Sequence, residues 1–219
     1  MRNIIKFAFS VTILIFGNNI FGQSRSIDIF SLVQSGKMKG FNRTVTTFTE
    51  GNRKGISFDA KEGDGIAWIE GMDFTNGTIE LDIKGRDILQ QSFVGIAFHG
   101  QNNLTFESVY FRPFNFRSTD PLRKIHAVQY TFNPDFGWEK LRTDHPGVYE
   151  KGIDDPPLAT EWFHAKIVVN YPEIKVYVND SQTPSLEIQE LNSNKSGKIG
   201  IWVGNNSDGQ FANLVITPK

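Results

Sequence analysis

The chain has 219 residues with 19 Phe, 5 Tyr and 4 Trp, which is enough apolar mass for one domain with a sizeable core. Its formal net charge is -1 and it has no run of Lys or Arg, so we expect no nucleic-acid partner and no electrostatic membrane anchor. It contains no cysteine, which excludes disulfides and a cysteine-linked lipid, and the core alone must stabilise the fold.

Residues 1–22 have the features of a secretory signal peptide. Arg2 and Lys6 are followed by an apolar stretch at 7–16, and small and polar residues follow it. This stretch is too short to cross a bilayer, which takes ~20 apolar residues. We therefore expect cleavage near Gly22, one mature domain over 23–219, a secreted or periplasmic location, and no membrane contact after cleavage. The alternative is a membrane anchor that is retained.

Apolar and polar residues alternate with a period of two in many segments, which are bounded by Gly, Asn, Asp and Pro. This pattern predicts short strands, and no segment has a long helical period. The expected strands lie at 77–85, 93–100, 108–113, 126–132, 162–170, 173–179, 197–204 and 211–218. Such strands separated by polar turns are typical of an all-β sandwich or barrel, and we expect a sandwich of two antiparallel sheets. We expect no helix longer than about three turns.

This alternation places four polar residues on one face of their strands and the apolar residues on the opposite face. The polar residues are His99, Tyr110, Arg112 and Gln129, and Trp202 joins them if its strand lies in the same sheet. Arg, Gln and Tyr hydrogen-bond to the edges of sugars, and Trp offers a flat surface to their C–H faces. We expect Arg112 to contact a ligand and to be dispensable for the fold. The alternative is a polar sheet surface that only faces water.

The long segment 133–161 has no strand pattern and contains four prolines. Segments of this length are usually functional or disordered, and the aromatic residues Trp138 and Tyr149 favour a functional segment. We expect it to line the edge of a groove with Trp138 and Tyr149. Its histidine, His145, follows Asp144 and is a candidate general base or metal contact, or simply part of an Asp-His-Pro turn.

The strand segments together resemble a known superfamily. The pattern FVGIAFHG, FESVYFRPFNF, KIHAVQYTF, WFHAKIVVN, IKVYVND and GKIGIWVGNNSDGQFANLVIT is similar to the concanavalin A-like lectin/glucanase superfamily. Within it, the chain resembles laminin-G-like jelly rolls and bacterial 3-keto-disaccharide hydrolase-like domains over residues 65–217. The resemblance implies a two-sheet antiparallel jelly roll with a concave sheet that meets glycans, and calcium as a candidate cofactor. The residues themselves identify no metal ligands.

One catalytic motif of the superfamily is incomplete in this chain. Laminarinase-type glycosidases carry Glu-x-Asp-x-x-Glu on one strand, whereas here Glu80 and Asp82 are followed by Gly85 at the third position. Double-displacement hydrolysis needs both of its carboxylates, so we expect Glu80 and Asp82 to form only a polar outer face. A nucleophile elbow is absent as well. Whether the chain is an enzyme therefore stays open.

The function that these observations favour is a secreted β-sandwich that binds an oligosaccharide or polysaccharide on its concave sheet. Tyr110, Arg112, Gln129, Trp138 and Trp202 are the expected ligand contacts. A first alternative is an enzyme that cleaves 3-keto-glycosides by elimination, with His99 or His145 as the base and Arg112 polarising the ketone. A second alternative is a structural or adhesion module of the laminin-G-like type.

Overall fold

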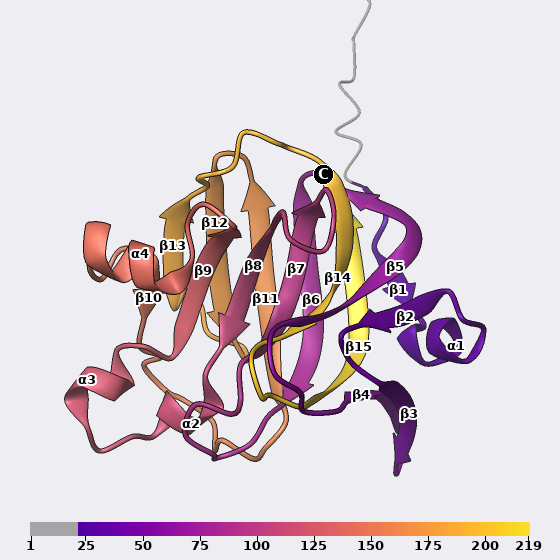
Figure 1. Ribbon diagram of the computed structural model, residues 1–219, viewed down its shortest axis with the longest axis horizontal. Helices are drawn as coiled ribbons and strands as arrows, with labels where there is room; N and C mark the ends of the chain where they lie inside the picture. Colours follow the sequence, from indigo (N-terminus) through magenta and orange to yellow (C-terminus); the bar gives the residue numbers. More distant parts are fainter. Residues whose placement is uncertain (1–21) are drawn as a thin grey trace, which may run out of the picture.

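Two antiparallel sheets pack face to face across an apolar core in the computed structural model, which describes residues 22–219 (Figure 1). The predicted two-sheet jelly-roll sandwich is confirmed. The signal peptide predicted for residues 1–22 lies almost wholly outside the described residues. The described part of the chain contains no helix that is long and apolar enough to cross a membrane.

The first sheet, sheet A, has eight strands. Its order is β13 (Leu186–Gln189), β12 (Glu173–Val178), β11 (Phe163–Asn170), β6 (Gly77–Lys84), β15 (Gly209–Pro218), β4 (Arg53–Phe58) and β3 (Val45–Glu50), and β1 (Arg25–Ile27) also pairs with β15. The second, sheet B, has seven strands. Its order is β10 (Glu150–Lys151), β9 (Val128–Asn133), β8 (Phe106–Phe111), β7 (Val94–Gly100), β14 (Gly197–Val203), β5 (Gly65–Phe74) and β2 (Met38–Phe41).

Within residues 22–219, four short helices join these strands. They are α1 (Ile29–Gln34), α2 (Pro113–Phe116), α3 (Pro121–Lys124) and α4 (Trp138–Asp144). The longest has seven residues, so the expected absence of long helices holds for the described residues. Figure 1 shows α2, α3 and α4 on the side of the molecule that carries β8, β9 and β10, while α1 lies at the opposite side.

The core follows from the alternation in the sequence. In β6, Ile79, Leu81 and Ile83 are buried while the residues between them are partly exposed. Because side chains alternate across a strand, one apolar face of each sheet meets the other sheet. Each large apolar side chain buried there contributes roughly 1.5–3 kcal/mol, and this core stabilises a chain that has no disulfide.

Sheet B differs from sheet A because its outer face is also covered. Every residue of β7 and β8 is buried, on both faces of the sheet. On the outer face, a second apolar cluster forms around Phe106, Tyr110 and Trp202, with Phe93 and Trp68 at its edge. This outer face carries the candidate site.

A β-bulge in β7 changes the face of the sheet toward which one predicted site residue points. Lys198 of β14 pairs with Gly100, but Gly200 pairs with Ala97, so β7 carries one extra residue in this interval. His99 lies in the bulge with a positive φ of 48°. Alternation counted from Val94 therefore fails at His99, whose side chain is fully buried and hydrogen-bonds Glu107.

Candidate functional site

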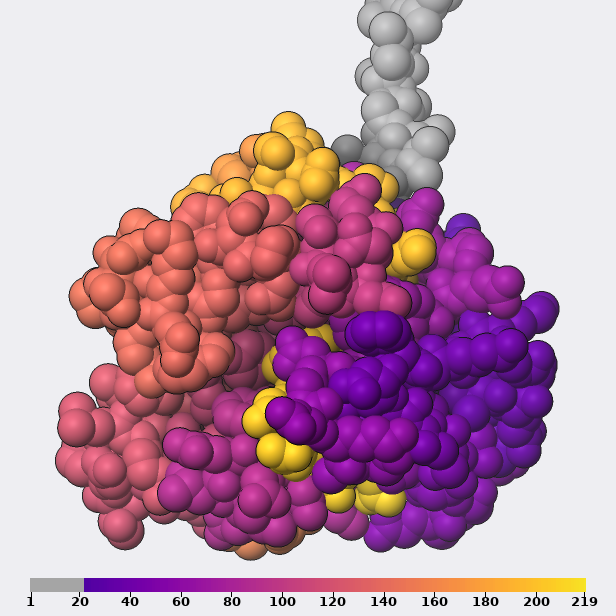
Figure 2. All heavy atoms as spheres, in the orientation of Figure 1, coloured from indigo at the N-terminus to yellow at the C-terminus, as the bar shows by residue number. Residues whose placement is uncertain are grey.

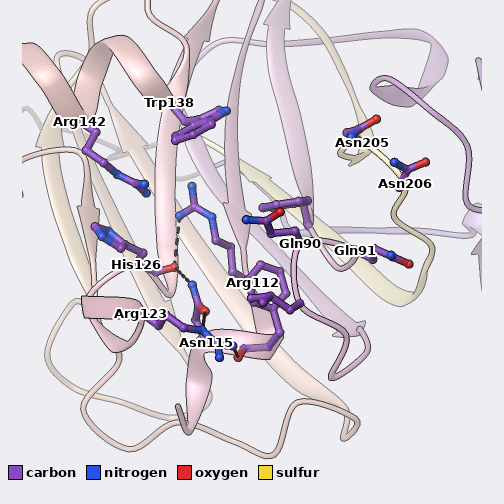
Figure 3. Close-up of a pocket in the computed structure, with 13 residues that line it drawn as sticks. Gln90, Gln91, Arg112, Asn115, Arg123, His126, Trp138, Arg142, Asn205 and Asn206 are labelled. Carbon is purple, nitrogen blue, oxygen red and sulfur yellow. Dashed lines mark hydrogen bonds between the residues drawn. The ribbon is translucent and has the colours of Figure 1, made fainter. Parts of the chain in front are cut away.

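A pocket of about 510 Å³ opens on the outer face of sheet B, and basic side chains line it (Figure 3). Its lining includes Arg112, Arg123, His126 and Arg142, with Trp138 at the edge, and no acidic residue. We call it the cationic pocket. It is bounded by α2, α3, α4 and the loops 85–93 and 204–208, which hold these side chains over the ends of β8 and β9.

A smaller pocket of about 120 Å³ adjoins the cationic pocket, since both are lined by Phe93, Trp138 and Asn205. Tyr110 and Trp202 form its aromatic floor, so we call it the aromatic pocket. The two pockets together are the groove. Figure 2 shows the surface hollowed between the salmon segment that includes α4 and the indigo and purple segments beside it.

The groove floor is a hydrogen-bonded group of three residues from neighbouring strands. Tyr110 Oη donates to Gln129 Oε1 at 3.1 Å, and Arg112 Nη2 donates both to Tyr110 Oη at 3.0 Å and to Gln129 Oε1. Tyr110 is opposite Gln129 in the β8–β9 register, so alternation places both on the outer face. The structure therefore brings together Tyr110, Arg112 and Gln129 as expected.

Trp202 joins this floor from β14. Its ring lies 4.8 Å from that of Tyr110, and Gly95 stands between them in the register of β7. A Cβ on Gly95 would overlap the Val109 carbonyl oxygen and come within 2.7 Å of Tyr110 Cβ, so glycine allows β7 and β8 to lie close together at this position. The condition set for Trp202 is met, because β14 lies in the same sheet as β8 and β9.

A buried glutamate, Glu150, organises the basic side chains of the cationic pocket. Arg142 donates to it through Nε and Nη2, each at 2.7 Å, in the two-pronged arrangement that suits a carboxylate. Arg112 Nη1 lies 3.5 Å from Glu150 Oε2, and His126 Nδ1 lies 2.8 Å from the same atom. Glu150 pairs with Gln129 in the β10–β9 register, which fixes it beside the floor.

These contacts set the protonation of the pocket. Burial by itself would raise the pKa of Glu150, but hydrogen bonds from Arg142 and the charge of Arg112 outweigh it and lower the pKa. Burial lowers the pKa of His126, and the charges of both arginines add to this effect although Glu150 opposes it. At neutral pH we therefore expect a charged Glu150 and an uncharged His126 beside the arginines.

The arginines also have donors left over for a ligand. Arg142 uses Nε and Nη2 for Glu150, and Arg123 uses Nε and Nη2 for Asn115 and the Phe114 carbonyl. Within the described part of the chain, Nη1 of each has no hydrogen bond to protein. Figure 3 shows the His126 carbonyl accepting from Arg112 and Asn115.

Three predicted residues lie elsewhere than expected. His99 faces the interior because of the bulge, so the expectation that it shares the face of Tyr110 is wrong. Tyr149 is only 7% exposed and packs on Tyr130 in the core, so it does not form the groove edge. His145 is exposed at the end of α4, packs edge-on against Tyr149 and does not line either pocket. Trp138 does lie at the groove edge and is 44% exposed.

Sequence reasoning missed several titratable residues in and behind the groove, namely Arg123, His126, Arg142, Glu150 and Asp64. Ala127 and Val128 are both in the core, so the alternation of β9 does not extend back to His126. Arg142 and Glu150 come from the segment without strand pattern. Only the aromatic and charged residues of 133–161 indicated that this segment contributes to a binding site.

Glu80 and Asp82 lie on the other sheet, away from the groove. They belong to β6 of sheet A and face outward, as expected, where both interact with His164. Asp82 also contacts Arg53 and Asn213. This arrangement is a surface ion-pair group.

Comparisons with known proteins identify the fold class of this chain. No family model matches the chain, and no curated protein does. Among solved structures, the chain is similar to a Bacillus subtilis protein with a galectin-like fold (TM-score 0.61, 13% identity, 90% of this chain and 97% of that one). It is also similar to the carbohydrate-binding module CBM66 from Bacillus subtilis (TM-score 0.59, 15% identity, 81% of this chain and 93% of that one). A third similar structure is the mannose- and calcium-bound exoplasmic domain of VIP36 (TM-score 0.56, 11% identity, 89% of this chain and 88% of that one).

These neighbours share a lectin-type sandwich. The fold of this chain is therefore the concanavalin A-like jelly roll that its strand pattern resembles. At such low identity the likeness concerns the fold, and function has to be argued from the groove.

Proposed function

We propose that the protein is a secreted or periplasmic module that binds an acidic glycan in its groove. The glycan is a uronate-containing oligosaccharide or polysaccharide, with one carboxylate in the cationic pocket and a neighbouring sugar over the aromatic pocket. The observation that carries the proposal is the lining of the cationic pocket by three arginines and no acidic residue.

The charge balance favours an anionic ligand. Three arginines line the pocket, and Glu150 behind them neutralises one, which leaves a formal excess of two positive charges. The unused Nη1 groups of Arg123 and Arg142 offer charge-assisted hydrogen bonds, which are about twice as strong as neutral ones. A neutral glycan offers these donors only hydroxyl and ether oxygens, which carry no charge and accept weaker hydrogen bonds, so the pocket favours a sugar carboxylate.

The aromatic pocket supplies the second part of the recognition. Trp138, Trp202 and Tyr110 surround it, and flat aromatic surfaces suit the C–H faces of sugar rings. Asp64 also lines this pocket, where its oxygens can accept hydrogen bonds from sugar hydroxyls. A carboxylate is repelled from Asp64 and attracted to the arginines, so the groove orients an acidic glycan along its length.

The neighbours give independent support. CBM66 is a carbohydrate-binding module and VIP36 is solved with mannose, so this fold serves glycan binding in other proteins. A 3-keto-glycoside reaction through His99 or His145 gains no support from the geometry, because neither residue lines the groove. Secretion rests on residues 1–22, and N-terminal analysis of the exported chain tests it.

The test is calorimetric binding of matched oligosaccharides to the purified protein. We expect oligouronates to bind and their neutral counterparts of equal length to bind at least about tenfold more weakly, a difference of ~1.4 kcal/mol. Arg142→Ala and Trp138→Ala should each weaken oligouronate binding by about tenfold or more.

Arg53→Ala is the matched control. Arg53 is on sheet A with a side chain 34% exposed, against 36% for Arg142, and it also contacts one carboxylate. It should bind oligouronates like the unchanged protein. Equal binding of neutral and acidic sugars would overturn the specificity, and full binding by Arg142→Ala with an intact thermal midpoint would overturn the site.

A further inference from the structure

Three side chains of kinds that can bind metal ions lie together inside the sandwich, and they do not line the groove. His99 comes from the bulge of β7, Glu107 from β8, and Glu190 directly follows β13. His99 Nδ1 lies 2.6 Å from Glu107 Oε2 and 3.7 Å from Glu190 Oε2. One ligand atom from each residue lies within 4.8 Å of the other two, and all three side chains are 0% exposed.

The surroundings of His99 fix which of its nitrogens faces the carboxylates. Nε2 lies 2.7 Å from the carbonyl oxygen of Thr75, which can only accept a hydrogen bond, so Nε2 carries the proton. In the neutral imidazole the lone pair is then on Nδ1, which faces the two glutamates. Phe74 stacks on the ring at 5.9 Å and holds it in this orientation. A backbone carbonyl behind a ligating histidine is the arrangement that orients metal-binding imidazoles.

The two carboxylates differ in how they are held. Glu107 accepts hydrogen bonds from Tyr130 Oη and, at 3.2 Å, from Asn192 Nδ2. Both oxygens of Glu190 are buried, and neither has a hydrogen-bond partner within the described residues. A buried carboxylate without a partner is costly to maintain, so a native structure rarely keeps one without a further interaction.

We propose that His99, Glu107 and Glu190 bind a divalent transition-metal ion, for which Zn²⁺ is the probe. One imidazole nitrogen and two carboxylates are a donor set that suits Zn²⁺ and similar ions. Ca²⁺ instead takes about six to eight oxygen ligands, which this cluster does not offer. The ion would be structural, because it would fasten the 190–196 connection to β7 and β8 in a site closed to solvent.

The experiment refolds the purified protein from urea, because the three side chains are buried and the metal must reach them before the site closes. Refolding is done after chelation, with no metal, with ZnCl₂ or with CaCl₂. We expect one Zn²⁺ per chain by metal analysis and a rise in the thermal midpoint of roughly 5 °C or more at a hundredfold excess over Kd. CaCl₂ should leave the midpoint unchanged.

Two variants locate the site. Glu190→Gln keeps the side-chain shape and removes the unpartnered charge, so it should fold without metal and lose the bound Zn²⁺ and the Zn²⁺-dependent rise. His164→Gln is the control, since His164 forms the exposed histidine–carboxylate group on sheet A with Asp82 and Glu80. It should bind Zn²⁺ like the unchanged protein.

Three results would overturn the proposal. They are the absence of bound Zn²⁺ after refolding, retention of Zn²⁺ by Glu190→Gln together with its loss in His164→Gln, and equal stabilisation by Ca²⁺. None of these results depends on glycan binding, so the metal site and the groove are tested separately.

Discussion

Arg112 is the residue on which the groove floor depends. It is 4% exposed, and its guanidinium contacts the ring of Tyr110 at 5.0 Å and that of Phe93 at 5.7 Å. It donates to Tyr110, to Gln129 and to the His126 carbonyl, and it lies beside Glu150. A buried cation with this many partners is part of the fold as well as part of the pocket.

We therefore predict that Arg112→Ala destabilises the protein. Removing one member of a buried ionic group leaves its partners unsatisfied and costs about 3 kcal/mol or more. Urea unfolding of Arg112→Ala and Arg142→Ala compares the two arginines. We expect the larger loss of unfolding free energy for Arg112→Ala, because the Arg142 side chain is 36% exposed. An Arg112→Ala protein as stable as the unchanged one would contradict this.

Alternation in the sequence was enough to place Tyr110, Arg112 and Gln129 on one face, but it does not reveal burial. The expectation that Arg112 is dispensable for the fold is at odds with its buried contacts, because α2, α3 and α4 cover the outer face of sheet B. These helices have four, four and seven residues and leave no helical period in the sequence. The wrong face was predicted for His99 because of the bulge in β7. A bulge residue with positive φ is often glycine, but here it is a histidine, so the sequence gives no sign of the extra residue.

At the scale of elements, one carboxylate links α4 to β10, the edge strand of sheet B. Glu150 lies in the two-residue strand β10, and Arg142 in the last turn of α4 holds it with two hydrogen bonds. β10 itself pairs with β9 over only two residues. The ionic group around Glu150 therefore links the 133–161 segment to the sheet, in addition to the core packing of Leu141 and Tyr149.

This link predicts a loss of stability in acid. The pKa of Glu150 is lowered, so its contribution is present above the ordinary value of 4.5 and is lost as the pH falls through the folded-state pKa. The lowered pKa of His126 acts in the same direction below 6.5, because the unfolded chain takes up its proton first. Unfolding free energies of the unchanged protein and of Glu150→Gln should differ by ~1–3 kcal/mol at pH 7 and converge towards pH 3. A difference that is constant with pH would contradict the assignment.

Strands with clean alternation were predictable, and those without it were not. The segments at 77–85, 162–170 and 173–179 correspond to β6, β11 and β12, and the hairpin between the last two is present. The strands β1 to β5 were not assigned, because glycine and charged residues interrupt the apolar pattern in 38–58 and the outer positions of β5 are themselves partly buried. β7 and β8 were predicted although both of their faces are buried, so the interrupted apolar pattern is what concealed the strands in 38–58.

At the scale of the whole molecule, the net charge of -1 conceals a local excess of positive charge. Composition excluded nucleic acid because no basic run occurs, and the basic residues of the groove are in fact dispersed between residues 112 and 142 in sequence. Folding brings them to one pocket, whereas acidic residues such as Glu80 and Asp82 lie on the other sheet. Total charge is therefore a poor guide to the partner, and the local field of the groove decides it.

This local field predicts that salt weakens binding of an acidic glycan. Added ions screen the attraction between the uronate and the arginines, and the screening length falls from about 10 Å at 0.1 M to about 3 Å at 1 M salt. Calorimetric titrations across this range should show the oligouronate affinity falling several-fold. Arg142→Ala should show a smaller salt dependence because one attracting charge is gone, while Arg53→Ala on the opposite sheet should keep the full dependence. Stacking on Trp138 and Trp202 is not screened in this way, so residual binding at high salt should be lost in Trp138→Ala. An oligouronate affinity that is independent of salt would show that the arginines hold the fold of the pocket and do not attract the ligand.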